Sequence, residues 1–162
     1  MFEIIAINEE SRGKAISLIQ ENWGSSNIIT KGKIHLANNL MGYLTVFNDK
    51  LVGLITYCIE NDECEIVSLD SIIENQGIGA SLLDKVIKIA NENKCKRIWL
   101  ITTNDNTKAI RYYQKKGFSI KDIYINSIQE SRKIKPEIPL YGFDNIPILH
   151  EIEFELQCLN KK

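Results

Sequence analysis

The chain has 162 residues, of which 44% are hydrophobic and 25% are charged, and its 20 basic and 21 acidic side chains leave a formal net charge of -1. This size and composition predict one globular domain over residues 1–162 and exclude a disordered or collagenous chain. The near-neutral charge argues against a nucleic-acid-binding protein, and no stretch approaches the ~20 apolar residues of a membrane span.

The first quarter of the chain begins with a strand and a helix. Residues 2–7 are apolar and β-branched, which predicts a strand. Asn8 can cap a helix that runs to Glu21, with Ile16, Ile19 and Trp23 on one face and Gly24 as its stop. Residues 25–41 contain a glycine, lysines and paired asparagines, which favour a short helix and mobile loops over a sheet.

The middle of the chain is dominated by strands. Residues 42–47 and 51–60 are strand-like runs joined by the hairpin turn Asn48-Asp49-Lys50. A second tight turn at Asn61-Asp62 leads into a third strand at 63–70. These three runs predict an antiparallel meander.

The hydrophobic period then changes from that of a strand to that of a helix. Residues 78–90 carry apolar side chains on one helical face. The elements expected after this helix are a strand at 97–102, a helix at 106–116, a strand at 118–125, a helix at 127–135 and a strand at 148–156. The strand-helix-strand unit implies two parallel strands with a right-handed crossover, so a mixed α+β sheet with helices on its faces is expected.

A glycine-containing loop, Glu74-Asn75-Gln76-Gly77-Ile78-Gly79-Ala80, joins the strand at 63–70 to the helix at 78–90. The first N–H groups of a helix have no partner within it, and glycines allow an anion to approach the backbone closely. The loop therefore predicts a pyrophosphate site, and the alternative is a tight turn without a ligand. No third glycine at Leu82 completes a dinucleotide fingerprint, and no Gly-Lys-Ser/Thr follows for a nucleoside triphosphate.

A second pattern follows the next parallel strand. Its residues read N-x-x-A-x-x-x-Y-x-x-x-G-F and are Asn106, Ala109, Tyr113, Gly117 and Phe118. Because ligands gather beyond the carboxyl ends of parallel strands, Asn106 and Tyr113 are expected to lie beside whatever the glycine loop binds.

The stretch from about Glu63 to Phe118 resembles the core of the GNAT superfamily of N-acetyltransferases. Q-G-I-G-A-S-L-L resembles the phosphate loop of that family, and the second pattern resembles its following helix. The resemblance implies a GNAT-like sheet of about seven strands, mostly antiparallel with one parallel strand-helix-strand unit, and helices on both faces. It implies an enzyme that moves the acetyl group of acetyl-coenzyme A to a primary amine by direct attack on the thioester, without a metal.

The same resemblance implies roles for individual residues. The backbone N–H groups of the loop would hold the pyrophosphate; they belong to Gln76, Gly77, Ile78, Gly79 and Ala80. Leu69 would lie where the strands diverge and pair with the pantetheine arm, Asn106 would hydrogen-bond that arm, and Tyr113 would lie near the sulfur. Glu74 departs from the Arg or Gln often found there in the family, and its carboxylate repels a pyrophosphate unless it points outward or finds a cation.

Transfer to an amine requires a base for the amine and a proton donor for the departing thiolate. Tyr113 is the candidate general acid, and its alternative role is core packing. Glu63 and Glu65 lie on one face of their strand, and either could receive the proton directly or through a water. The sequence does not choose between them, and a solvated acid is the alternative for each. His35 could line the acceptor site, although an exposed loop histidine is the simpler interpretation.

Cysteine usage and the remaining patterns bear on location and partners. The four cysteines form no C-x-x-C pair and the two histidines lie far apart, which predicts free thiols, a reducing cytoplasm and no metal site. The expected partner is a small-molecule or peptide amine, with no nucleic acid and no membrane. The strand at 148–156 could form an edge used in a homodimer. The rival function, prompted by Glu74 and the unassigned base, is an acyl-CoA-binding or sensor domain of the same fold without efficient catalysis.

Overall fold

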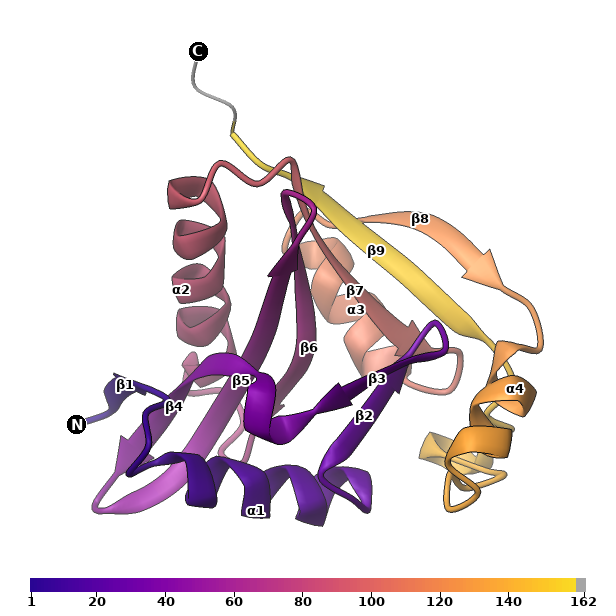
Figure 1. The fold of residues 1–162 in the computed structure, drawn as a ribbon, viewed down its shortest axis with the longest axis horizontal. Helices are drawn as coiled ribbons and strands as arrows, with labels where there is room; N and C mark the ends of the chain where they lie inside the picture. The colour runs from indigo at the N-terminus through magenta and orange to yellow at the C-terminus, as the bar shows by residue number, and fades with distance from the viewer. Residues whose placement is uncertain (160–162) are drawn as a thin grey trace.

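The computed structural model describes residues 1–159, which form a seven-stranded mixed sheet with an additional two-stranded hairpin (Figure 1). The sheet strands are β1 (Glu3–Ala6), β4 (Met41–Phe47), β5 (Lys50–Glu60), β6 (Glu63–Ser71), β7 (Arg97–Thr103), β8 (Ser119–Tyr124) and β9 (Glu151–Gln157). Their order is β1-β4-β5-β6-β7-β9-β8, and the pairing is antiparallel except between β6 and β7. The expected mixed sheet with one parallel strand-helix-strand unit is confirmed.

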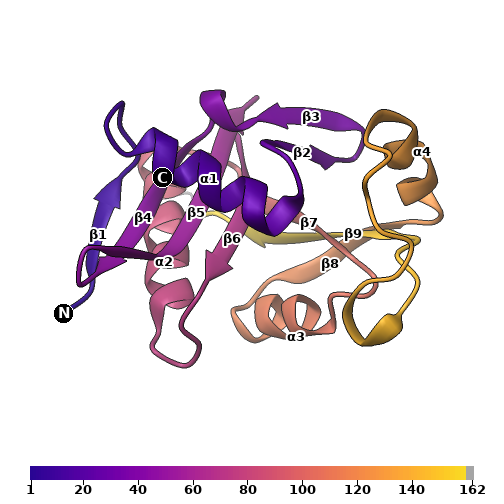
Figure 2. The ribbon, with the colours of Figure 1, turned by 90° about the horizontal axis from the view of Figure 1, so that it is seen from below.

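Helices cover both faces of the sheet (Figure 2). The remaining elements are α1 (Arg12–Trp23), β2 (Asn27–Thr30), β3 (Lys33–Leu36), a 3-10 turn (Ala37–Asn39), α2 (Ile78–Glu92), α3 (Thr107–Lys115), α4 (Ser127–Ile134) and a second 3-10 turn (Phe143–Asn145). α1 and the β2–β3 hairpin lie on one face, and α2 and α3 lie on the other. None of the helices within residues 1–159 is both long and apolar enough to cross a membrane.

The start and the buried face of α1 differ from the prediction. Asn8 and Ser11 exchange two hydrogen bonds of 2.9 Å, from each backbone N–H to the other side chain, and the helix starts only at Arg12. The buried residues are Ala15, Leu18 and Ile19, while Trp23 remains 40% exposed. The expected stop is confirmed, because Gly24 takes a left-handed conformation with φ +78°.

The interpretation of residues 25–41 as a short helix and mobile loops without sheet structure is wrong for most of this range, in which only Ala37–Asn39 form a short 3-10 turn. Residues 27–36 form the β2–β3 hairpin, whose two-residue turn is Lys31-Gly32 with φ values of +49° and +75°. Two successive positive φ values suit the right-handed twist of the flanking strands, and the apolar, β-branched residues on either side of Lys-Gly stabilise it. The hairpin lies over the central strands and ends near α4 (Figure 2).

The final strand is not an edge. β9 lies between β7 and β8 and begins at Glu151, so β8 forms that margin of the sheet. A homodimer built on the edge of the strand at 148–156 is therefore excluded. The prediction failed because the order of elements along the chain suggests pairing of the last strand with β8 but does not show that it also pairs with β7.

Gly53 of β5 allows α2 to pack close to the sheet, and a larger residue at this position should destabilise the fold. A β-carbon on Gly53 would lie 2.6 Å from Ile78 Cγ2 and 3.1 Å from Leu82 Cδ1, which is closer than ordinary van der Waals contact. We expect Gly53→Ala to lower the free energy of unfolding by about 2 kcal/mol in urea titration, because α2 must shift to admit the methyl group.

Gly13 in α1 provides the matched control, since no atom lies within 4 Å of the β-carbon it lacks. Gly13→Ala should raise stability by about 0.5–1 kcal/mol through helix propensity. Equal effects of the two substitutions would contradict the close packing of α2 on β5.

Candidate functional site

The two parallel strands pair over a short stretch and then diverge. The β6–β7 register runs from Glu63 opposite Arg97 to Ile66 opposite Leu100. Beyond these residues β6 continues along β5 to Ser71, and β7 continues along β9 to Thr103. Figure 1 shows the two strands separating toward the start of α2. We call this divergence the seam, and Leu69 lies on it.

The loop from β6 to α2 presents free backbone N–H groups beside the seam. Gly77 caps α2 in a left-handed conformation, with φ +73°, and no side chain caps the helix. The first hydrogen bond inside α2 runs from Ser81 N to Gly77 O at 3.0 Å, so the N–H groups of Ile78, Gly79 and Ala80 have no partner in the helix. The first turn carries no acidic residue. This arrangement suits a phosphate group.

The carboxylate that breaks the expected loop pattern lies next to a cation. Glu74 Oε1 is 3.6 Å from Lys108 Nζ, at the start of α3, and both side chains are largely exposed. An exposed pair contributes little stability. Its effect is to offset the negative charge that Glu74 adds near the loop.

The turn between β7 and α3 is rigid. Asn106 caps α3 by accepting a 3.2 Å hydrogen bond from Ala109 N at Oδ1, which leaves Nδ2 as the atom that can donate to a ligand. Asp105 is 2% exposed and accepts hydrogen bonds from Thr103 Oγ1 and Phe143 N. These bonds fix Asn106 at the carboxyl end of β7.

Tyr113 is both a core residue and a neighbour of the seam. It is 7% exposed, and its ring lies 5.4 Å from Phe118 and 6.3 Å from Phe154 between centroids. Burial, followed by the charges of Tyr112 and Asp70, raises the pKa of the Tyr113 hydroxyl. Tyr113 belongs to the same apolar cluster as Ile66 and Leu100, the last pair of the parallel register, and Leu69 packs against that cluster, so the ring lies on the α3 side of the seam.

Sequence reasoning missed a role for Tyr112. Its hydroxyl is buried and has no hydrogen-bond partner within the described part of the chain. It lies 3.5 Å from the position a β-carbon would take on Gly79. The start of α2 is therefore adjoined by a polar atom that lacks a partner, which is compatible with a polar ligand at this loop.

The two candidate bases have different surroundings. Glu63 is held by Arg97, with contacts of 3.1 Å to Nε and 3.3 Å to Nη2. Glu65 is 4% exposed, accepts a 2.6 Å hydrogen bond from Thr30 Oγ1, and lies 3.2 Å from His35 Nε2. His35 is itself 4% exposed, so the interpretation as an exposed loop histidine is wrong. The β2–β3 hairpin buries it against β6.

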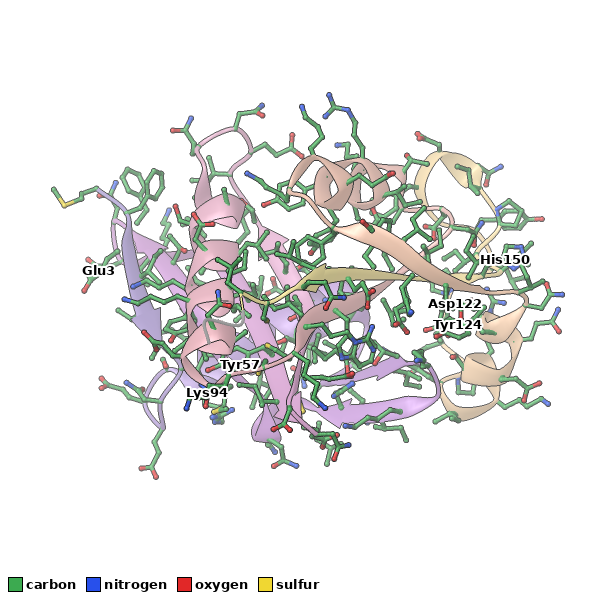
Figure 3. All side chains as sticks on the ribbon, turned by 90° about the horizontal axis from the view of Figure 1, so that it is seen from above. Glu3, Tyr57, Lys94, Asp122, Tyr124 and His150 are labelled. Atoms are coloured by element: carbon green, nitrogen blue, oxygen red, sulfur yellow. The ribbon has the colours of Figure 1, made fainter. Side chains whose placement is uncertain are left out.

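A stripe of glutamates on β9 was also missed. Glu151, Glu153 and Glu155 alternate along the strand and face the hairpin side, while the residues between them face α2 and α3. Glu153 accepts bonds from Arg97 Nη1 at 2.7 Å and from the hydroxyl of Tyr124, at the α4 end of β8 (Figure 3). The strict alternation of Glu with apolar residues in 151–156 indicates that the glutamates share one face of the strand.

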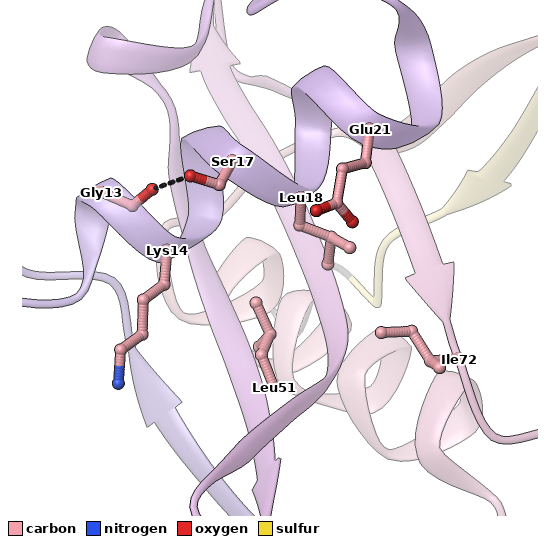
Figure 4. Close-up of a pocket in the computed structure, with 7 residues that line it drawn as sticks. All are labelled: Gly13, Lys14, Ser17, Leu18, Glu21, Leu51 and Ile72. Carbon is pink, nitrogen blue, oxygen red and sulfur yellow. Dashed lines mark hydrogen bonds between the residues drawn. The ribbon is translucent and has the colours of Figure 1, made fainter.

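Two depressions of the surface lie away from the seam. A groove of about 350 Å³ runs beside α1, with Gly13, Ser17 and Leu18 on one side and Leu51 and Ile72 on the other (Figure 4). A cavity of about 60 Å³ separates the hairpin from α4. Residues 1–159 contain no group of three or more side chains placed to hold a metal ion, and the four cysteines are free.

Comparison with known proteins gives one consistent result. The family model described as "Acetyltransferase (GNAT) family" matches residues 4–118. The chain is 44% identical over 137 residues to "Uncharacterized protein YxbD" of Bacillus subtilis (strain 168), which covers 84% of this chain and 86% of that protein.

Two solved structures show the same fold. The IAA acetyltransferase from Bacillus cereus ATCC 14579 gives a TM-score of 0.74 at 16% identity, over 97% of this chain and 99% of that one. A GNAT family acetyltransferase from Elizabethkingia anophelis with acetyl-CoA bound gives a TM-score of 0.69 at 20% identity, over 96% of this chain and 97% of that one.

Proposed function

The chain belongs to the GNAT family of acetyltransferases, and we propose that it transfers the acetyl group of acetyl-coenzyme A to the nitrogen of an amine acceptor. The observation that carries this proposal is the seam. A helix start with unpaired N–H groups follows β6, and the buried ring of Tyr113 belongs to the same apolar cluster as Ile66 and Leu100, where the parallel pairing ends. The acetyl-CoA seen in the structural relative from Elizabethkingia anophelis supports the choice of cosubstrate.

Each part of the cosubstrate has a candidate binding group. The pyrophosphate would accept hydrogen bonds from the backbone at Gln76–Ala80, as the dipole of α2 favours. The amides of the pantetheine arm would pair with the free edge of β6 near Leu69 and with Asn106 Nδ2. This places the thioester toward Tyr113. The four free cysteines support the expected cytoplasmic location.

The reaction forms a C–N bond and breaks a C–S bond. The amine lone pair attacks the thioester carbonyl carbon, the tetrahedral intermediate collapses, and coenzyme A leaves as a thiolate while the nitrogen loses a proton. A tyrosine, with an ordinary pKa of about 10, is a weaker acid than a thiol near ~8.5, and burial of Tyr113 raises its pKa further. Full proton transfer from Tyr113 is therefore uphill, so we assign its hydroxyl to hydrogen-bond the developing thiolate.

For the base we favour Glu65 acting with His35. Both oxygens of Glu63 are engaged by the guanidinium of Arg97, which leaves fewer lone pairs to accept a hydrogen bond from an amine or a water. The contact between Glu65 and His35 instead forms a carboxylate–imidazole pair, an arrangement that relays protons in many enzymes. It lies on the hairpin side of β6, opposite the face that carries α2 and Tyr113.

Glutamine variants separate the two glutamates. We expect Glu65→Gln to lower kcat/KM by about 30-fold and to change the acidic limb of the pH–rate profile, because the general base is lost. Glu63→Gln should keep the wild-type profile with a loss of about 2-fold or less. Melting temperatures of both proteins control for folding, and a larger loss in Glu63→Gln would reverse the assignment.

The function itself is tested by following thiol release from acetyl-CoA across a panel of amines. Acetyl transfer predicts amine-dependent thiol release together with an acetylated acceptor of the expected mass. Tight binding of coenzyme A in calorimetry without turnover on any amine would instead favour the sensor function.

A further inference from the structure

The tip of the β2–β3 hairpin places a primary ammonium group against side chains from three neighbouring strands of the sheet. Lys31 Nζ lies 2.9 Å from Glu153 Oε1, 5.2 Å from the centroid of Trp99 and 4.9 Å from that of Tyr124. These partners come from β9, β7 and β8. We call Trp99, Tyr124 and Glu153 the cage.

The cage has the composition of an ammonium-binding site. Aromatic faces attract a cation through their quadrupoles, and a carboxylate supplies a charge-assisted hydrogen bond. Burial lowers the pKa of Lys31, but hydrogen bonds to Tyr124 and Glu153 more than offset this, so its pKa lies above the ordinary lysine value. The group that occupies the cage is therefore a charged alkylammonium.

Groups other than Lys31 hold the cage in shape. The Tyr124 hydroxyl donates a 2.8 Å hydrogen bond to Glu153 Oε1, and Arg97 Nη1 donates to Oε2 at 2.7 Å. The Arg97 guanidinium also lies 5.2 Å from the Trp99 ring. Withdrawal of Lys31 would leave these contacts intact, so a ligand could replace it.

A second carboxylate beside the cage lacks a full set of partners. Glu151 is 2% exposed; its Oε2 accepts a 3.0 Å bond from the backbone N–H of Lys31, while its Oε1 is buried without a partner in residues 1–159. A buried acceptor left unpaired costs about 1–3 kcal/mol. An ammonium donor that replaced the Lys31 side chain could satisfy this oxygen.

The charge balance of this face also favours a cationic ligand. Four carboxylates gather around the cage, from Glu63, Glu151, Glu153 and Glu155, against the cations Arg97 and Lys31. If Lys31 leaves, one cation faces four carboxylates. A ligand that carries positive charge would restore the balance.

We propose that the cage, with Glu151, binds an ammonium group of the acceptor, that Lys31 occupies this site until the acceptor arrives, and that the acceptor is an alkyl diamine or polyamine. This proposal rests on the proposed acetyl transfer. An ammonium in the cage has no lone pair and cannot attack a thioester, so the acceptor needs a second nitrogen.

The position of the cage fits a short alkyl acceptor. Glu153 is paired with Ile101, the first residue of β7 beyond the parallel register. Neighbouring strands lie about 4.8 Å apart, so the β9 glutamates are one or two strand spacings from the seam. A diamine anchored at one end by the cage could extend its other nitrogen toward the thioester.

The test is calorimetric titration of the protein with butane-1,4-diamine in the absence of acetyl-CoA. Lys31→Met removes the internal competitor but keeps the β-carbon, so the backbone at φ +49° is not further strained. We expect Lys31→Met to bind the diamine about 10-fold more tightly than wild type and Glu153→Gln to bind it about 10-fold more weakly. Lys33→Met is the matched control, because Lys33 pairs with Glu60 outside the cage, and it should bind like wild type.

The proposal would be overturned if Lys31→Met gained no affinity or if Glu153→Gln kept the affinity of wild type. Circular dichroism confirms that each variant is folded, and Lys31→Gln gives an independent measurement at the same position. Thiol release with other amines but no diamine binding overturns the cage and leaves acetyl transfer intact. Diamine binding that follows the expected pattern, without thiol release on any amine, supports the cage and defeats the proposed function.

Discussion

Replacing Tyr113 with phenylalanine is expected to lower kcat by about 100-fold while the KM for acetyl-CoA changes little. The ring packs against Phe118 and Phe154, and phenylalanine keeps that packing, so the fold should be retained. The variant loses only the hydroxyl that would hydrogen-bond the departing thiolate. Steady-state kinetics with a saturating amine, supported by a melting curve, measure the effect.

The neighbouring tyrosine provides the control. Tyr112→Phe removes the same group one residue earlier on α3, from a side chain whose hydroxyl lies beside Gly79. It should keep kcat within about 3-fold of wild type, because that hydroxyl lies at the phosphate loop and not at the sulfur. Equal kcat values for Tyr113→Phe and wild type would refute the role of the phenol.

Introducing a carboxylate at Gly79 is expected to weaken coenzyme A binding by about 100-fold without lowering stability. Aspartate at this position would repel the pyrophosphate and would compete for the free N–H groups at the start of α2. The helix dipole stabilises a negative charge in the first turn, so the melting temperature of the variant should equal or exceed that of wild type. The loss of affinity therefore cannot be attributed to unfolding, and calorimetry with coenzyme A measures it directly.

Gly79→Ala is the matched variant. Its β-carbon would meet only the Tyr112 hydroxyl at 3.5 Å, an ordinary contact, so affinity should stay within about 3-fold of wild type. If Gly79→Asp bound coenzyme A as tightly as Gly79→Ala, the pyrophosphate would have to bind elsewhere.

Local patterns predicted most of the architecture. The period of the apolar residues in α2, the Asn48-Asp49 turn between β4 and β5, and the order of elements from β4 to α4 all agree with the structure. These features depend on residues close together in sequence. The glycine loop at Gly77–Gly79 and the pattern that begins at Asn106 could be recognised for the same reason, because each is a short motif at a helix start.

The contacts of the β2–β3 hairpin with the sheet were not predicted, because they join distant segments of the chain. The contact of His35 with Glu65 joins residues 30 positions apart, and that of Lys31 with Glu153 joins residues 122 apart. The Lys-Gly turn could have been recognised from its β-branched flanks. Nothing local says that the hairpin folds over β6 and β9, and the burial of His35 and of the β9 glutamates follows from that placement.

The divergence of β6 and β7 leaves an unpaired edge in the interior of the sheet. Each strand is bonded on its outer side, to β5 and to β9, while past Ile66 and Leu100 their inner sides face one another without pairing. Proteins usually keep such edges at the margin of a sheet and protect them there, because any extended chain can add to them. An amide-bearing arm lying in this interruption would act as a substitute strand. The cosubstrate would then complete the architecture for as long as it stays bound, and its departure would restore two smaller sheets joined by four residue pairs.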